Sequence, residues 1–159
     1  MPEWSPPAWM YLGGSRPSSD AGYFENMTRC IFQAGLNWKV IDVKWPGFRK
    51  AFHDFDVDKV ASLGDADVER LMKDGSIVRN RRKIEATISN AKEFEKIAQE
   101  HGGFGSWLDS IDKADNYSLV KKRLSDHFRH VGEGTAHIFL FSVGEGIEPN
   151  DACKQDSLG

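Results

Sequence analysis

Residues 130–136 (HVGEGTA) separate two segments with different apolar patterns, and this stretch constrains the fold more than any other. Before it, Val120, Leu124 and Phe128 recur every fourth residue, which is the spacing of an amphipathic helix. After it, residues 136–143 are apolar on nearly every side, as in a helix buried within a domain core. The pattern therefore predicts two helices joined by a short, glycine-containing corner.

The glycines of this corner allow the backbone to turn sharply and to approach a partner closely. Thr135 stands where a hydroxyl could cap the second helix, which would leave a positive helix end facing solvent as a seat for phosphate. This arrangement is typical of a helix-hairpin-helix, which grips nucleic-acid backbone without reading sequence. A plain helix–helix corner with a glycine cap is the alternative. The predicted contact residues are Val131, Gly132, Gly134 and Thr135.

Composition excludes several classes of protein. A chain of 159 residues with 40% hydrophobic and 28% charged residues is typical of one globular domain. The first residues lack the basic and apolar regions of a secretory signal, and no apolar run is long enough to cross a membrane. The cysteines, Cys30 and Cys153, do not form a disulfide framework. We therefore expect a cytoplasmic protein that does not bind membranes, and the predicted nucleic-acid contact would associate it with the nucleoid.

The charge is unevenly distributed along the chain. A net charge of −3 argues against a wholly basic nucleic-acid binder. Cations nevertheless cluster in residues 79–83 (RNRRK) and 121–123 (KKR), and such local patches suit a protein that touches DNA with one face. Solvated helix faces are the alternative. Arg79 and Arg81 are the candidate DNA contacts in the first cluster.

The chain is predicted to be all-α, since no stretch alternates with a period of two. Three parts are expected: an irregular proline- and aromatic-rich arm (1–20), a helical domain (21–151) and a flexible tail (152–159). The aromatic residues of the arm, Trp4, Trp9 and Tyr11, are expected to pack back onto the domain.

Capping residues predict where several helices begin and end. Asp56 and Asp65 are the expected N-caps of helices 57–63 and 66–73. A long helix is expected to end at Gly102, and a short amphipathic helix to span 104–111.

An ordered set of motifs carries a family resemblance. They are QAGLNW at 33–38, FRKAF at 48–52, FDVDKVA at 55–61, DVERL at 67–71, GSIVRNRRKI at 75–84 and ISNA at 88–91. The set resembles the DNA-3-methyladenine glycosylase I family, within the helix-hairpin-helix DNA glycosylase superfamily, over roughly 24–151. The resemblance implies two helical lobes flanking a base-binding cleft. It also implies base excision repair: alkylated purines, chiefly 3-methyladenine, are flipped out of DNA and their N-glycosidic bonds hydrolysed, without a cofactor.

The resemblance also implies roles for individual residues. The loop that enters the duplex beside the flipped nucleotide corresponds to Gln33, Ala34, Gly35 and Leu36. A small residue beside an apolar tip is a suitable wedge. Trp38 matches an aromatic of the base pocket, where an indole face attracts the cationic 3-methyladenine. A core aromatic that anchors two helices is the alternative for Trp38.

This chain departs from the family in its pocket. The family has a glutamate three residues before the position matched by Gln33, and Cys30 stands there. A thiol neither accepts from the adenine edge as a carboxylate does nor balances a positive charge at neutral pH. Cys30 is expected to be a buried, inert thiol rather than a nucleophile. Tyr23 is a further candidate for the pocket, where Trp4, Trp9 or Tyr11 are alternatives.

The family's zinc clip also has no counterpart in this sequence, because its N-terminal segment has no Cys or His and the tail after Asp151 has no His. No metal site is therefore expected. Asp151 stands near the position of a catalytic aspartate in other branches of the superfamily, where it would stabilise the oxocarbenium-like sugar. A surface carboxylate is the alternative for Asp151, and Glu25 and Asp42 are weaker candidates.

The leading hypothesis is a monomeric glycosylase that acts on double-stranded DNA containing damaged bases. A catalytically degenerate relative that binds DNA or damaged bases without cleavage is the second hypothesis, because the pocket glutamate is missing. A helical interaction domain that retains only the scaffold is the third.

Overall fold

The computed structural model describes residues 5–11, 14–151 and 153, and within these ranges it is built from helices and the segments that connect them. The prediction of an all-α chain is therefore confirmed. In chain order the elements are α1 (Asp20–Gln33), α2 (Trp38–Ala51), the 3-10 turn η1 (His53–Phe55), α3 (Val57–Ala61), α4 (Asp65–Leu71), α5 (Arg81–His101), α6 (Phe104–Asp109), α7 (Ala114–His127) and α8 (Glu133–Ser142).

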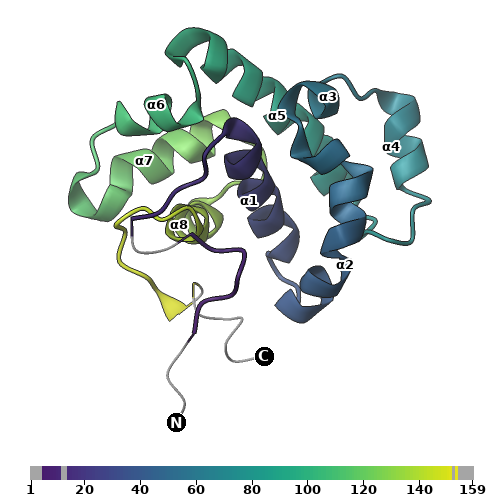
Figure 1. Cartoon of the computed structure of the whole chain (residues 1–159), viewed down its shortest axis with the longest axis horizontal. Helices are drawn as coiled ribbons and strands as arrows, with labels where there is room; N and C mark the ends of the chain where they lie inside the picture. The colour runs from purple at the N-terminus through teal and green to yellow at the C-terminus, as the bar shows by residue number, and fades with distance from the viewer. Residues whose placement is uncertain (1–4, 12–13, 152, 154–159) are drawn as a thin grey trace.

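The helices form two lobes with α1 between them (Figure 1). Helices α2, α3 and α4 gather on one side of α1, and α6, α7 and α8 gather on the other. The long helix α5 spans both groups, since it contacts α3 and α4 at one side and α6 at the other. Helix α1 packs against α8, α5 and α2, so it is the wall shared by the two lobes.

Aromatic side chains fill the core that joins the lobes. Phe24 of α1 packs edge-on against Phe55, with ring centroids 5.7 Å apart, and lies 5.4 Å from Phe94 of α5. Phe94 in turn stacks on Phe104 at 4.8 Å. These four rings have no solvent exposure, and full burial of each stabilises the fold by about 1.5–3 kcal/mol. The lobes therefore share one continuous core.

Helix α8 is the buried helix expected after the glycine corner. Residues 136–142 are all buried, because this helix lies between α1 and α7. The predicted cap is wrong, however: Gly132 is the N-cap, the helix begins at Glu133, and Thr135 lies in its first turn. With Gly132 at the cap, the first turn of α8 receives no side-chain hydrogen bond.

The Asp56 cap and the end of the long helix at Gly102 are confirmed, whereas α3, α4 and α6 each end two residues earlier than predicted, at Ala61, Leu71 and Asp109. The Asp56 carboxylate caps α3 by accepting from the Lys59 amide, and α5 ends at Gly102 with φ of 84°. Asp65 is not a cap. Gly64 precedes α4, and its amide donates to the Asp67 carboxylate at 2.9 Å, because three residues of separation bring that side chain back over the helix end.

The segment before α1 packs onto α8. The Tyr11 amide donates to the Ser142 carbonyl at 2.7 Å, and Asn26 Nδ2 of α1 donates to the same carbonyl at 3.2 Å. Met10 is buried, and Trp9 packs against Trp38. Trp4 and most of the predicted tail (152 and 154–159) lie outside the described residues.

Among the residues that the structure describes, no helix combines the length and apolar character needed to cross a membrane.

We expect Gly144→Ala to lower the free energy of unfolding by about 3 kcal/mol or more. Gly144 has φ of 83°, and a Cβ there collides with the Ser15 carbonyl oxygen. Gly102→Ala is the matched control, because its φ of 84° carries the same backbone strain with no atom within 4 Å, and strain alone costs about 1–2 kcal/mol. Urea denaturation followed by circular dichroism measures both. Equal losses would show that the contact with Ser15 does not constrain the fold.

Candidate base-binding cavity and DNA-contacting hairpin

A cavity of about 210 Å³ lies where the end of α1, the start of α2 and the first turn of α8 meet. Its lining residues are Cys30, Gln33, Ala34, Gly35, Trp38, Gly134, Thr135 and Ile138. The fold therefore brings predicted pocket, wedge and hairpin residues to one place, although about 100 residues of chain separate Gly35 from Gly134.

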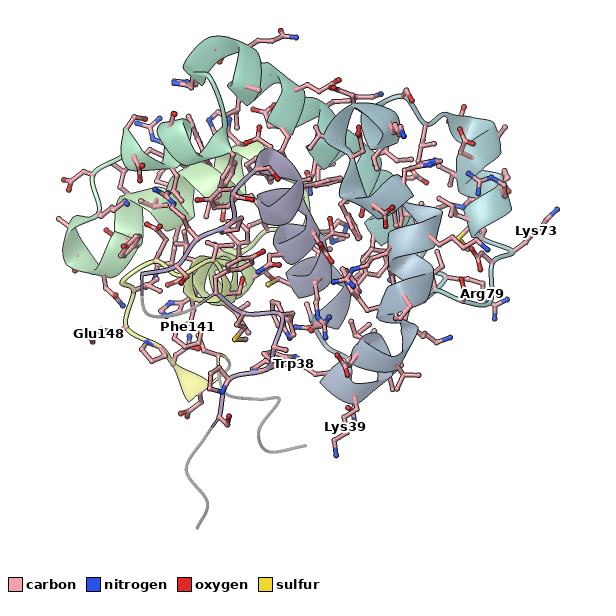
Figure 2. The ribbon with its side chains drawn as sticks, in the orientation of Figure 1. Trp38, Lys39, Lys73, Arg79, Phe141 and Glu148 are labelled. Atoms are coloured by element: carbon pink, nitrogen blue, oxygen red, sulfur yellow. The ribbon has the colours of Figure 1, made fainter. Side chains whose placement is uncertain are left out.

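Trp38 forms an aromatic wall of this cavity. It is 5% exposed and meets Trp9 in a T-shaped pair with ring centroids 6.0 Å apart. Figure 2 shows Trp38 below α1, between α8 and α2. The indole is thus both a packed core residue and a cavity wall, so the two interpretations of Trp38 are not exclusive. Trp9 is the arm aromatic that the structure places beside it.

Gln33 is held by a buried arginine one helical turn earlier. Arg29 Nε donates to Gln33 Oε1 at 3.1 Å, and Arg29 Nη2 pairs with Asp42 Oδ1 at 2.8 Å. The guanidinium also lies over the rings of Trp9 and Trp45, at 4.7 and 5.1 Å from their centroids. Hydrogen bonds, ion pairing and aromatic contact together offset the cost of burying this charge.

Cys30 lines the cavity as a neutral thiol. Burial raises the pKa of this thiol to about 12, although a hydrogen bond with Ser142 opposes the rise. At neutral pH the cavity wall therefore carries no negative charge at the position where the resemblance implies a glutamate. None of the residues lining the cavity is acidic.

The loop after α1 is exposed, whereas the last residue of α1 is buried. Ala34, Gly35 and Leu36 face solvent, Gly35 with φ of 78° and Leu36 with 36% of its surface exposed. Gln33 is 3% exposed and belongs to α1, so its predicted place in the exposed wedge is corrected. Helix α1 continues to Gln33 because its apolar face remains covered until that residue.

Lys83 supports this loop from α5. Its Nζ donates to the carbonyl of Ala34 at 3.1 Å and to that of Phe32 at 3.4 Å, so it binds carbonyls at the C-terminal end of α1. Partial burial lowers the pKa of Lys83. The sequence placed Lys83 only in a basic cluster; its role as an anchor of the loop was missed, since no local pattern reveals a contact made across some 50 residues.

The turn between α7 and α8 is held by Asn90 of α5. Its Oδ1 accepts from the Arg129 amide at 2.8 Å, and its Nδ2 donates to the Arg129 carbonyl at 3.1 Å. Sequence reasoning did not assign this role, although Asn90 lies in the ISNA motif. Gly132 and Gly134 are exposed, whereas Val131 is buried, so Val131 can offer only its backbone to a ligand.

Tyr23 does not line the cavity. It lies near the opposite end of α1, accepts a hydrogen bond from Arg16 Nε at 2.7 Å and packs on Phe104. Seven residues of helix separate it from Cys30, about 10 Å along the axis. Tyr23 is therefore not among the residues that line this cavity, and its ring packs in the core.

The remaining carboxylates lie outside the cavity lining. Glu25 accepts from Trp45 Nε1 and from Arg49 Nε, each at 2.8 Å, and Asp42 pairs with Arg29. Asp151 is exposed. Cys153, two residues after Asp151, is buried, and it adds to the rise in the pKa of the Cys30 thiol, whose main cause is burial.

The predicted basic contacts lie on the α2–α4 lobe. Figure 2 shows Arg79 and Lys73 at the outer edge beside α4, away from Trp38. Arg81 is exposed and pairs with Glu69 of α4 at 2.7 Å. Within the described part of the chain, no group of three or more His, Cys, Asp or Glu residues is arranged to hold a metal ion.

Residues 13–136 match the sequence model of the methyladenine glycosylase family. The chain belongs to this family. It is 31% identical over 130 residues to the DNA-3-methyladenine glycosylase of Haemophilus influenzae, covering 70% of each chain. It is 45% identical over 67 residues to DNA-3-methyladenine glycosylase 1 of Escherichia coli, covering 42% of this chain. The second match spans 36% of the Escherichia coli protein, about a third of its length.

Solved structures agree with the family assignment. The 3-methyladenine DNA glycosylase I of Staphylococcus aureus, solved to explain its recognition of 3-methyladenine, matches with a TM-score of 0.73 at 27% identity, covering 86% of this chain and 82% of that one. A solution structure of 3-methyladenine DNA glycosylase I matches with a TM-score of 0.70 at 30% identity, over 82% and 80%. The predicted family and glycosylase fold are confirmed, and the predicted activity agrees with the names of these relatives.

We expect Cys30 to resist alkylation at pH 8. Burial raises the pKa of its thiol from 9.0 to about 12, so its reactive thiolate is roughly a thousandfold scarcer than in the unfolded chain. Iodoacetamide labelling of native and urea-unfolded protein, read at each cysteine by mass spectrometry, measures the ratio. Rapid labelling of native Cys30 would contradict this and revive the nucleophile interpretation.

Proposed function

We propose that this chain is a DNA glycosylase that excises alkylated purines from double-stranded DNA by nucleotide flipping. One observation carries the proposal: a single cavity is walled by an aromatic residue, by the exposed loop after α1 and by the first turn of α8. A base must leave the helical stack before its glycosidic bond can be attacked. The cavity therefore lies beside the two elements that base flipping requires: the loop after α1, which can enter the duplex, and the first turn of α8, which can hold the phosphates.

The exposed loop is suited to enter the duplex. Leu36 provides an apolar tip, and Gly35 allows the tight backbone on which it stands. Because Lys83 holds the Ala34 carbonyl, the loop is fixed relative to α5 before DNA binds. A wedge that is already ordered loses less entropy on insertion between base steps.

The hairpin is suited to hold the phosphates beside the flipped nucleotide. The first N–H groups of a helix have no partner within it, and they carry partial positive charge. In α8 they belong to residues 133–135, next to the exposed Gly132, because the Ala136 amide already donates to the Gly132 carbonyl at 2.8 Å. A phosphate seated there would bring its nucleotide to the mouth of the cavity, which Gly134 and Thr135 line.

The reaction is hydrolysis. Water adds to C1′ of the deoxyribose and gives up a proton to solvent, while the glycosidic bond breaks and its electron pair leaves with the base. An alkylated purine that carries positive charge is a good leaving group. The sugar that develops positive charge is stabilised by a nearby carboxylate, for which we propose Asp151.

Other features follow from this proposal. The substrate is DNA containing damaged bases, and the chain acts as a monomer inside the cell, where its DNA lies. The competing possibility is a relative that binds such DNA without cutting it, and the specific observation in its favour is Cys30, a neutral thiol in an otherwise uncharged cavity.

We expect the protein to release methylated purines from methylated duplex DNA above the spontaneous rate, measured by chromatography of the free bases. Asp151→Asn should lower that release by roughly 100-fold, because it removes the charge that stabilises the sugar. Asp54→Asn, another exposed carboxylate, is the control. Unchanged release by Asp151→Asn would exclude that residue, and duplex binding without any release would establish the non-cleaving relative.

We expect Gly134→Asp to weaken salt-sensitive binding of duplex DNA by 10-fold or more, since it places negative charge where the phosphate would lie. No atom lies within 4 Å of a Cβ at Gly134, so the variant should fold normally. Gly75→Asp adds the same charge at an open glycine outside the hairpin and cavity and is the control. Fluorescence anisotropy across a range of salt concentrations measures binding, and equal effects of the two variants would exclude the hairpin as the contact.

A further inference from the structure

We propose that a groove between α7 and the first turn of α8 is a second contact for the DNA backbone, in which the Glu133 carboxylate occupies the Lys121 cation until a phosphate replaces it. The α7–α8 groove has a volume of about 230 Å³ and is lined by Ser118, Lys121, Lys122, Ser125 and Glu133. The inference rests on the proposed function, because it takes double-stranded DNA as the ligand of this face.

The α7 side of the groove offers hydrogen-bond donors from a single helix face. Its lining residues lie at positions 118, 121, 122 and 125, a spacing that aligns them along one side of a helix. They are lysines and serines, whose ammonium and hydroxyl groups commonly contact DNA phosphates. The line from Ser118 to Ser125 is about 10 Å long, and a DNA strand carries one phosphate per roughly 3.4 Å of duplex axis. The groove therefore suits a run of phosphates better than a lone anion.

Lys121 is held at the centre of this line by α8. Only 13% of its side chain is exposed, and α7 packs against α8 (Figure 1). Its Nζ lies 3.4 Å from His137 Nδ1, which can only accept from an ammonium, and 3.5 Å from Glu133 Oε1. The other ring nitrogen of His137, Nε2, donates to the Glu148 carbonyl at 2.7 Å. The ammonium is therefore positioned before any ligand arrives.

The Lys121 ammonium retains capacity for a stronger acceptor. Its contacts with His137 and Glu133 are longer than the usual N–H···O distance of roughly 2.7–3.2 Å. An ammonium has three protons to donate, and an anionic oxygen approaches it to about 2.8 Å. A phosphate oxygen in the groove would therefore make a shorter contact than either of the present partners.

Glu133 has the properties of a stand-in for phosphate. It is the first residue of α8, where the helix dipole favours negative charge, and its carboxylate faces Lys121. Its side chain is 83% exposed, so it can turn into solvent, and such an exposed pair contributes little to stability. A phosphate that enters the groove therefore replaces the carboxylate both at Lys121 and at the positive end of α8.

The exchange gives the two charges opposite effects on DNA binding. Lys121 strengthens binding because it gains a shorter, charge-assisted contact. Glu133 weakens binding because its carboxylate competes for the same ammonium and repels the incoming phosphate. Both effects concern the backbone and so apply to damaged and undamaged duplexes alike.

The first test removes the cation. Lys121→Gln should weaken duplex binding roughly 5-fold and lower the slope of log K against log salt by about 0.9, because one phosphate contact is lost. Lys121→Arg should retain both values. Lys96→Gln removes an exposed cation of α5 outside the groove and is the control. Fluorescence anisotropy over a series of salt concentrations measures binding, and circular dichroism melting curves show that each variant is folded.

The second test removes the carboxylate. Glu133→Gln should tighten duplex binding roughly 3-fold or more at low salt, because the competing charge is gone and Lys121 remains. Glu100→Gln, at an exposed carboxylate of α5, is the control. Unchanged or weaker binding by Glu133→Gln would overturn the stand-in role of this residue.

Duplexes in which one phosphate at a time is replaced by an uncharged methylphosphonate locate the contact. The native protein should lose affinity when the phosphate at Lys121 is neutralised, and Lys121→Gln should lose sensitivity to that phosphate alone. The imidazole signals of His137 in ¹⁵N NMR spectra should shift when the duplex binds, since Lys121 changes partner. An equal shift with the same concentration of inorganic phosphate would show a site for free anions and overturn DNA as its ligand.

The outcomes separate the two proposals. Weaker binding by Gly134→Asp together with unchanged binding by Lys121→Gln would overturn the groove contact and leave the glycosylase function standing. Failure of the native protein to bind any duplex would overturn the proposed function itself.

Discussion

The packing of α8 against α1 is the interaction on which the site depends. It places the first turn of α8 beside the end of α1, and the cavity exists only because these two helix ends meet. Ser142 joins the contact, since its carbonyl accepts from both Asn26 of α1 and the Tyr11 amide. The same contact buries the Cys30 thiol and so raises its pKa. The chemistry of the cavity is therefore a consequence of helix packing.

Two polar side chains of α5 extend this arrangement outward. Lys83 fixes the loop after α1, and Asn90 fixes the turn before α8. They lie seven residues apart, about two helical turns, so both project from one face of α5. One helix thus sets the positions of the proposed wedge and of the proposed phosphate contact. A rigid helix serves this purpose because a site must hold its elements closely in register.

Much of the fold was predictable because the signals for it are local. The apolar spacing around residues 120–128, the glycine at 102 and the Asp56 cap each act within a few residues, and each prediction agrees with the structure. Prediction failed at two helix N-termini, where more than one nearby residue could serve as the N-cap. Thr135 and Asp65 both have the chemistry of a cap, yet Gly132 and Gly64 occupy those positions. A cap depends on where the helix starts, and tertiary packing decides that.

The sequence by itself determined the helical class, the family and the residue types available to the pocket. Ordered motifs and periodic apolar residues can be recognised without knowledge of the tertiary structure. Only the tertiary structure decided which of them meet. Tyr23 and Cys30 belong to the same helix, but they lie about 10 Å apart along its axis. Of the two, only Cys30 lines the cavity. The structure places Gln33 on the cavity wall rather than in the predicted wedge, and Arg29 donates a hydrogen bond to its amide oxygen. Burial and the direction of a hydrogen bond are properties of the packed chain, and they decide what the site can bind.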